Sequence, residues 1–144
     1  MAVHTKSSVP IVFIHDYRAL PFPRKRLVSL AQRIYKQEKI APFKETLVVF
    51  CSDYVIKKLN TRFRNKPCAT DVLSFNYDDS DLVGEIYISL QRAMIQSRRF
   101  NSTYDAEIER LFIHGMMHLL GFDHETGSER ISMETREKRY RTTP

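Results

Sequence analysis

Residues 111–120 read LFIHGMMHLL and set the architecture expected for this chain. Apolar side chains fall on nearly every face of a helix drawn through this segment, which is typical of a helix buried in a protein core. The pattern begins near Thr103, where residues 102–105 offer a capping hydroxyl and an acidic first turn. We therefore expect a helix over residues 103–120, with the rest of the chain packed around it.

The elements expected around this helix are both strands and helices, so the class is α+β or α/β. The two alternating segments at residues 71–75 and 83–89 are expected to pair. Ser52 or Asp53 can cap a short helix that follows the second strand, and a polar, basic loop is expected after it over residues 62–70. The remaining expected strands are residues 9–14 and 46–51, and the remaining expected helices are residues 24–38, 89–99 and 128–140.

Length and composition bound the class of protein. The 144 residues suit one domain, and 42% hydrophobic with 28% charged residues is the composition of a globular protein. No apolar segment approaches the roughly 20 residues of a membrane span, and the start MAVHTKSSVP has no signal-peptide pattern, so we expect no membrane association and cytoplasmic residence. The net charge of +6 favours an anionic partner, with nucleic acid as the first candidate.

Three of the five histidines fall within eleven residues. His114 and His118 are four residues apart, so a helix places both imidazoles on one face. Gly121 can end that helix in a left-handed conformation, and the returning chain then brings His124 towards the same point. A buried imidazole without a polar partner costs about 1–3 kcal/mol. One divalent ion can be the partner of several imidazoles at once. The spacing therefore predicts a metal site on His114, His118 and His124.

Zinc (Zn2+) is the expected ion because imidazole is a borderline ligand, although other divalent transition metals also fit the spacing. Three protein ligands leave a position for water, as in hydrolytic zinc sites. Such a site lowers the pKa of its bound water towards 7. Asp123 or Glu125 can close the coordination, but Asp123 is placed at least as well to accept a ring N–H from a ligand. Cys51 and Cys68 lie far from the cluster in sequence and are expected to be buried or incidental thiols.

The order H-x-x-x-H-x-x-G-x-x-H is also that of the metzincin proteases, in which a Glu after the first histidine is the general base. Gly115 occupies that position here. Loss of a general base costs about 10²–10⁴ in rate, so proteolysis is the weaker interpretation. Met133 offers an equivalent of the metzincin Met-turn, but we expect it to be a core residue of the helix over residues 128–140.

The segment HGMMHLLGFDH at residues 114–124 resembles the signature of the bacterial YbeY family of metal-dependent endoribonucleases. Two further segments agree with the resemblance: LNTRFR, which leads to TDVLSF at residues 70–75, and GEI, which begins at residue 84. Glu85 departs from the Asp that is more usual there, and Cys68-Ala69 is less polar than the family leads us to expect. The similarity covers residues 46–135.

The resemblance implies an α+β fold, with one compact domain over residues 1–144, a small mixed β-sheet packed against several helices, and a zincin-like metal helix. It also implies zinc on the three histidines, Arg64 as a catalytic residue in the cleft, and RNA as the substrate. The implied process is maturation of ribosomal RNA, including the 3′ end of the small-subunit RNA, and ribosome quality control. Its partners would be the ribosome, ribosomal RNA and ribosome assembly factors.

Two other function classes stay open at this point: a metallopeptidase without the usual Glu, and a non-catalytic, metal-stabilised ribosome-binding factor. The strand near residues 84–89 is expected to be ordinary sheet structure, with a substrate-orienting sheet edge as the alternative. Each basic group is expected to be a solvated helix face, although together the groups can follow an RNA backbone. These groups are residues 24–26, 57–58, 98–99 and the cations of residues 136–141.

Overall fold

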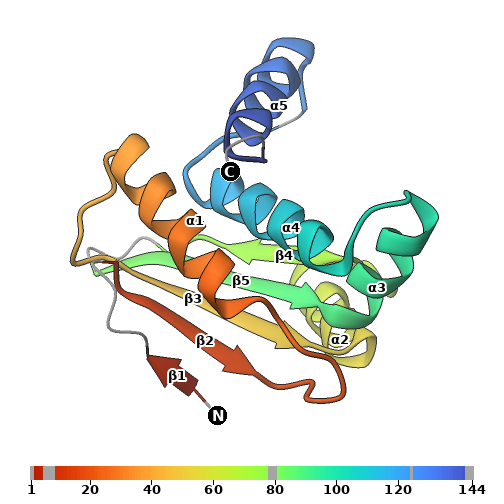
Figure 1. The fold of residues 1–144 in the computed structure, drawn as a ribbon. Helices are drawn as coiled ribbons and strands as arrows, with labels where there is room; N and C mark the ends of the chain where they lie inside the picture. The colour runs from red at the N-terminus through yellow and green to blue at the C-terminus, as the bar shows by residue number, and fades with distance from the viewer. Residues whose placement is uncertain (1, 5–8, 78–80, 124, 142–144) are drawn as a thin grey trace.

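The computed structural model describes residues 2–4, 9–77, 81–123 and 125–141, which form a five-stranded mixed sheet and five helices (Figure 1). The sheet has the order β1-β2-β3-β5-β4, with β2, β3 and β5 parallel and both outer strands antiparallel to their neighbours. The α+β class with a small mixed sheet is confirmed. The strands are β1 (Ala2–His4), β2 (Ile11–His15), β3 (Glu45–Cys51), β4 (Val72–Phe75) and β5 (Leu82–Ser89).

The central strand β3 is buried on both faces, as its run of β-branched and apolar residues predicts. Val48 and Phe50 join the main core, whereas Val49 and Cys51 face a second, smaller core. The main core lies against α1 (Arg24–Gln37) and α4 (Tyr104–Leu119), and the smaller one against α2 (Asp53–Arg64). In Figure 1, α1 and α4 cross the near face of the sheet and α2 lies behind it.

Side-chain hydroxyls begin three of the helices, and two of them, Ser52 and Thr103, are at residues where the sequence predicts caps. Ser52 accepts a hydrogen bond from the N–H of Val55 at 3.3 Å and starts α2. Ser89 does the same at the start of α3 (Leu90–Arg99), and Thr103 Oγ1 accepts from Ala106 N–H at 3.0 Å at the start of α4. Each cap satisfies an N–H group that has no partner within its helix.

The last helix, α5 (Gly127–Arg141), packs on α4 and reaches α1. Glu38, just after α1, accepts hydrogen bonds from Arg136 at 2.7 Å and from the Tyr140 hydroxyl. Burial is the main cause that raises the pKa of Tyr140, and its bond to Glu38 adds to the effect. Met133 is buried in the middle of this helix, so its expected core role is confirmed and a Met-turn is not present there. These contacts fix the position of α5 beside the histidines of α4.

The expected boundaries agree with the observed ones to within two residues, with two exceptions. The short strand β1 has no counterpart in the sequence-based prediction. Arg64 was expected in a loop and is instead the last residue of α2, which ends at Asn65 in a left-handed conformation. Within the described residues, no helix is long and apolar enough to cross a lipid bilayer.

Candidate metal centre and cleft

His114 and His118 lie one turn apart on α4, and their rings converge. The two Nε2 atoms are 3.2 Å apart, and the ring planes meet edge to face at 76° with centroids 4.7 Å apart. Both side chains are partly buried. The prediction that helical spacing brings these two imidazoles to one point is thus confirmed by the geometry.

The pair fits a zinc ion. Two nitrogens that each lie 2.0–2.1 Å from a tetrahedral zinc are about 3.3–3.4 Å apart, which is close to the observed Nε2–Nε2 separation. Within the described residues, no group of three His, Cys, Asp or Glu side chains forms a candidate metal cluster. The third predicted ligand, His124, lies outside the described residues, so the structure shows the positions of only the other two predicted ligands.

Glu137 of α5 lies behind His114. Its Oε2 atom is 2.8 Å from Nδ1 of His114, and the carboxylate is largely buried. A carboxylate on Nδ1 favours the tautomer that carries its proton there, which leaves the Nε2 lone pair directed at the ion position. From the sequence, Asp123 was expected to accept a ring N–H from a ligand, and Glu137 was not considered.

A signal for Glu137 is present in the sequence, because it follows Met133 by four residues and precedes Tyr140 by three. These spacings put the carboxylate on the same helix face as two apolar residues that are buried. A carboxylate on an apolar face needs a partner. His114 lies 23 residues before Glu137 in the chain, so it can be identified as that partner only from the packing of α5 on α4.

The end of α4 is a Schellman turn. The N–H of Phe122 donates to the carbonyl of Met117 and the N–H of Gly121 donates to the carbonyl of His118, both at 3.0 Å, and Gly121 has a φ of +94°. The left-handed glycine predicted at this position is therefore confirmed. The turn leads into Asp123, which lines the same cleft as the two histidines.

Gly115 is a point of close contact between α4 and the sheet. A Cβ atom at this residue would lie 2.8 Å from Cγ2 of Ile86 and 3.2 Å from Oγ of Ser74. The Ser74 hydroxyl donates to the Gly115 carbonyl across this contact at 3.2 Å. A glutamate here would have to enter the sheet–helix contact, so the general base of a metzincin protease has no room at its usual position.

The histidines open into a cleft of about 720 Å³ between the end of α2, the edge strand β4 and the end of α4. Arg64 lines this cleft, is exposed, and donates from Nη2 to the carbonyl of Ser74 at 3.0 Å. Its guanidinium lies 5.8 Å from the Phe75 ring centroid. The structure therefore brings Arg64, His114, His118 and Asp123 together. The other polar lining residues are Asn60, Lys66, Cys68, Thr70, Asp71, Ser74, Asn76 and Glu125.

The sheet edge at this cleft is β4. The strand considered from the sequence, over residues 84–89, is part of β5, which lies between β3 and β4 and is an interior strand. The preferred expectation of ordinary sheet structure is therefore confirmed for it. The edge role falls to β4, and the Arg64–Ser74 hydrogen bond shows that a cation can bind its outer carbonyl groups.

An ion pair between the buried Glu107 and the partly exposed Arg110 adjoins Asp71, which lines the cleft. Arg110 donates to both carboxylate oxygens of Glu107, at 3.0 and 2.6 Å, and its guanidinium lies 3.8 Å from Asp71. The hydrogen bonds that Arg110 donates to Glu107 are the main cause that raises the pKa of Arg110. Asp71 in turn accepts from the N–H of Val72 and from Gln96. This network holds the segment that enters β4.

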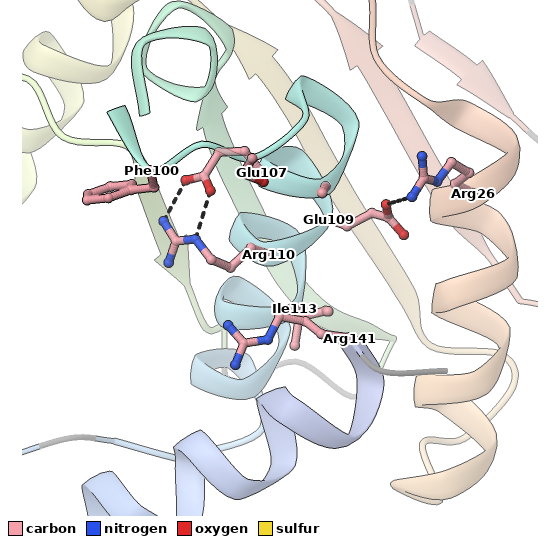
Figure 2. A pocket seen from close by; sticks show the side chains of 9 residues that line it. Arg26, Phe100, Glu107, Glu109, Arg110, Ile113 and Arg141 are labelled. Carbon is pink, nitrogen blue, oxygen red and sulfur yellow. Dashed lines mark hydrogen bonds and ion pairs between the residues drawn. The ribbon is translucent and has the colours of Figure 1, made fainter. Parts of the chain in front are cut away.

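The same pair borders a second, smaller pocket of about 380 Å³, which Figure 2 shows. Two of its three arginines form ion pairs with carboxylates: Arg110 meets Glu107, and Arg26 meets Glu109 at 2.5 Å. Burial is the main cause that raises the pKa of Glu109, and Arg26 opposes this shift. These two ion pairs offset most of the positive charge that the three arginines bring to the pocket, so the histidine cleft is the stronger candidate site.

Sequence comparison places the chain close to a set of bacterial nucleases. The family model for endoribonuclease YbeY matches residues 16–143. An endoribonuclease YbeY from Solibacter usitatus is 43% identical over 119 residues, which cover 82% of this chain and 77% of the relative. Another from Finegoldia magna is 42% identical over 99 residues, which cover 65% of each chain.

Structure comparison agrees. The solution structure of a Thermotoga maritima protein matches with a TM-score of 0.63 and 30% identity, and the match covers 91% of this chain and 86% of that one. Similarity therefore extends over the sheet, the helix α4 and the cleft.

Proposed function

We propose that this chain, which belongs to the endoribonuclease YbeY family, cleaves phosphodiester bonds of RNA. The proposed place of cleavage is the cleft between α2, β4 and α4. The observation that carries the proposal is the convergence of the two Nε2 atoms beside Arg64. This arrangement offers two nitrogen ligands and a cation facing one hollow. A phosphodiester is the substrate that such a combination suits, because its anionic oxygens bind both metal ions and guanidinium groups.

The proposed metal is zinc, held by His114 and His118 through Nε2 and by His124 as the third ligand. A zinc ion bound by imidazoles supplies Lewis-acid chemistry: it polarises a phosphoryl oxygen and makes water more acidic. The separation of 3.2 Å between the two Nε2 atoms supports this assignment.

The residues around the histidines have separate tasks in this proposal. Glu137 holds the His114 ring in one tautomer, so that Nε2 stays an acceptor. Arg64 binds a non-bridging phosphate oxygen and stabilises charge that develops as the bond breaks. Because the Arg64 side chain is exposed, it can leave the Ser74 carbonyl and bind a phosphate oxygen instead. Asp123 is proposed to accept the ring N–H of a ligand, as its place beside the histidines in the cleft allows.

The proposed biological substrate is ribosomal RNA, and the proposed process is maturation of the small-subunit RNA 3′ end with a part in ribosome quality control. The family name supports ribonuclease chemistry, and the net charge of +6 suits an RNA partner. The ribosome and its assembly factors are the proposed partners, and the cytoplasm is the proposed place of action.

The test is incubation of the purified full chain with structured RNA and with casein, each with and without a chelator. Chelator-sensitive RNA cleavage that is lost in His114→Ala, with stoichiometric zinc in the native protein, is the expected result. Cleavage of casein without cleavage of RNA would reverse the assignment in favour of a peptidase. Metal-dependent stability without either activity would instead favour a non-catalytic ribosome-binding factor.

A further inference from the structure

The outer face of α2 carries two large aromatic side chains that point to solvent. Tyr54 is 69% exposed and Phe63 is 59% exposed. They lie at opposite ends of a shallow groove of about 520 Å³ that α2 forms alone. Exposed rings gathered in one groove are unusual for a soluble domain surface and mark a contact site. The groove is lined by Tyr54, Lys57, Lys58, Leu59, Thr61, Arg62 and Phe63.

Cations accompany both rings. The Nζ atom of Lys58 lies 5.3 Å from the Tyr54 ring centroid, and Cζ of Arg62 lies 5.4 Å from that of Phe63. Throughout the described part of the chain, no carboxylate forms an ion pair with Lys57, Lys58 or Arg62. Arg26 and Arg110 of the pocket in Figure 2 differ, because carboxylates face them. The α2 face is therefore a positively charged surface with accessible rings.

This face continues into the cleft. Phe63 precedes Arg64, which lines the cleft, and the Phe63 ring packs edge to face on Phe75 of β4 at 5.5 Å. Asn60 of the same helix donates to the carbonyl of Cys68 in the cleft wall at 2.9 Å. A chain that leaves the cleft at Arg64 meets the α2 groove next.

We propose that the outer face of α2, residues 54–63, binds the single-stranded RNA that flanks the bond held in the cleft. Bases stack on Tyr54 and Phe63, and phosphates pair with Lys57, Lys58 and Arg62. Stacking platforms combined with a basic groove are how proteins hold single strands without reading their sequence, because every base has a π-face. The inference rests on the proposed function and deepens it, since it assigns the part of the substrate outside the cleft.

The first test measures fluorescence anisotropy of labelled oligouridylates of four and twelve nucleotides with the full chain on ice, with probe integrity checked on a gel. Tyr54→Ala is expected to weaken binding of the longer probe about 5- to 10-fold, as loss of one stacking platform does. It should leave the shorter probe, which the cleft alone can hold, unchanged. Tyr54→Phe keeps the ring and should bind both probes as the native chain does.

The second test measures how binding of the longer probe depends on salt. The double variant Lys57→Ala with Lys58→Ala should reduce the slope of log K against log salt by about 1.4, which is the loss of two phosphate contacts to a single strand. The matched control is Lys25→Ala with Lys36→Ala, which removes two exposed lysines from α1 across the sheet and should leave the slope unchanged.

The inference would be overturned if Tyr54→Ala bound both probes as tightly as the native chain does. It would also be overturned if Tyr54→Ala weakened binding of RNA and of heparin, which has no bases, to the same extent. An unchanged salt slope in the double lysine variant would overturn it as well. Unchanged RNA affinity with lost binding to RNA-free ribosomal proteins would make the face a protein contact and overturn it too. Length-dependent RNA binding that needs Tyr54, in a chain that does not cleave RNA, would support the inference while contradicting the proposed nuclease function.

Discussion

Oε2 of Glu137 lies 2.8 Å from Nδ1 of His114, and this contact joins α5 to the face of α4 that carries the two histidines. We expect Glu137→Gln to bind zinc about 10- to 100-fold more weakly, as loss of such outer carboxylates does. Calorimetric titration of the chelator-stripped full chain with zinc measures this. Glu134→Gln, an exposed residue of the same helix, is the matched control. Equal affinities of the two variants would contradict a role for Glu137.

Arg64 is exposed and makes its hydrogen bond to a backbone carbonyl at the edge of the sheet. Arg64→Ala should therefore leave the unfolding midpoint unchanged but lower RNA cleavage by 10-fold or more, because a charge-stabilising donor is typically worth about 10²–10³ in rate. Arg64→Lys should fall between the two, since lysine cannot offer a bidentate pair of donors. Arg99→Ala removes an exposed arginine from α3 and is the control. A cleavage rate unaffected by Arg64→Ala would remove Arg64 from the mechanism.

Gly115 has no space for a side chain, whereas Gly127 has no heavy atom within 4 Å of an added Cβ. Overpacking costs about 1–3 kcal/mol of folding free energy. Replacing glycine by alanine in a helix offsets up to about 1 kcal/mol of this cost, because alanine has the higher helix propensity. Gly115→Ala should thus lower the free energy of unfolding by about 1 kcal/mol, and Gly127→Ala should not lower it. Urea unfolding of both variants measures the difference. A stabilised Gly115→Ala would show that Ile86 can move aside at little cost.

Glu107 is a buried carboxylate, 3% exposed, with Arg110 as its ion-pair partner. Removing one member of a buried pair typically costs about 3–5 kcal/mol, because the other charge stays in a poorly solvating site. Because the Arg110 side chain is itself 35% exposed, we expect Arg110→Met to lose at most the lower end of this range, about 3 kcal/mol, in denaturant unfolding. Arg92→Met breaks the more exposed pair with Asp53 and should cost at most about 1 kcal/mol. Similar losses in the two variants would contradict the special burial of Glu107.

Burial raises the pKa of the Cys51 thiol to about 12 from an ordinary value of 9.0, and nearby Asp16 and Asp53 add to this effect. Below pH 9 the thiol is protonated in both states and adds no pH dependence. Between pH 9 and 12 the unfolded chain loses a proton that the folded chain keeps, so stability falls by up to about 1.4 kcal/mol per pH unit. Cys51→Ala should be less stable at pH 8 and lose less stability on going to pH 10.5. Denaturant unfolding at both pH values measures this, and parallel losses would contradict it.

The local features of the fold were predictable because they depend on neighbours in sequence. The caps at Ser52 and Thr103 and the left-handed Gly121 each act within one helical turn, so composition and spacing are enough to place them. The short strand β1 was missed because three residues carry no usable periodicity.

Of the candidate site, the sequence by itself determined the histidine pair, since a spacing of four residues in a helix puts His114 and His118 on one face whatever surrounds them. Only the tertiary structure decided that Glu137 is the partner of His114, that β4 is the sheet edge at the cleft, and that Gly115 abuts Ile86. Each of these three depends on how separate elements pack. Packing is set by the shapes of whole faces, to which residues far apart in the chain contribute together.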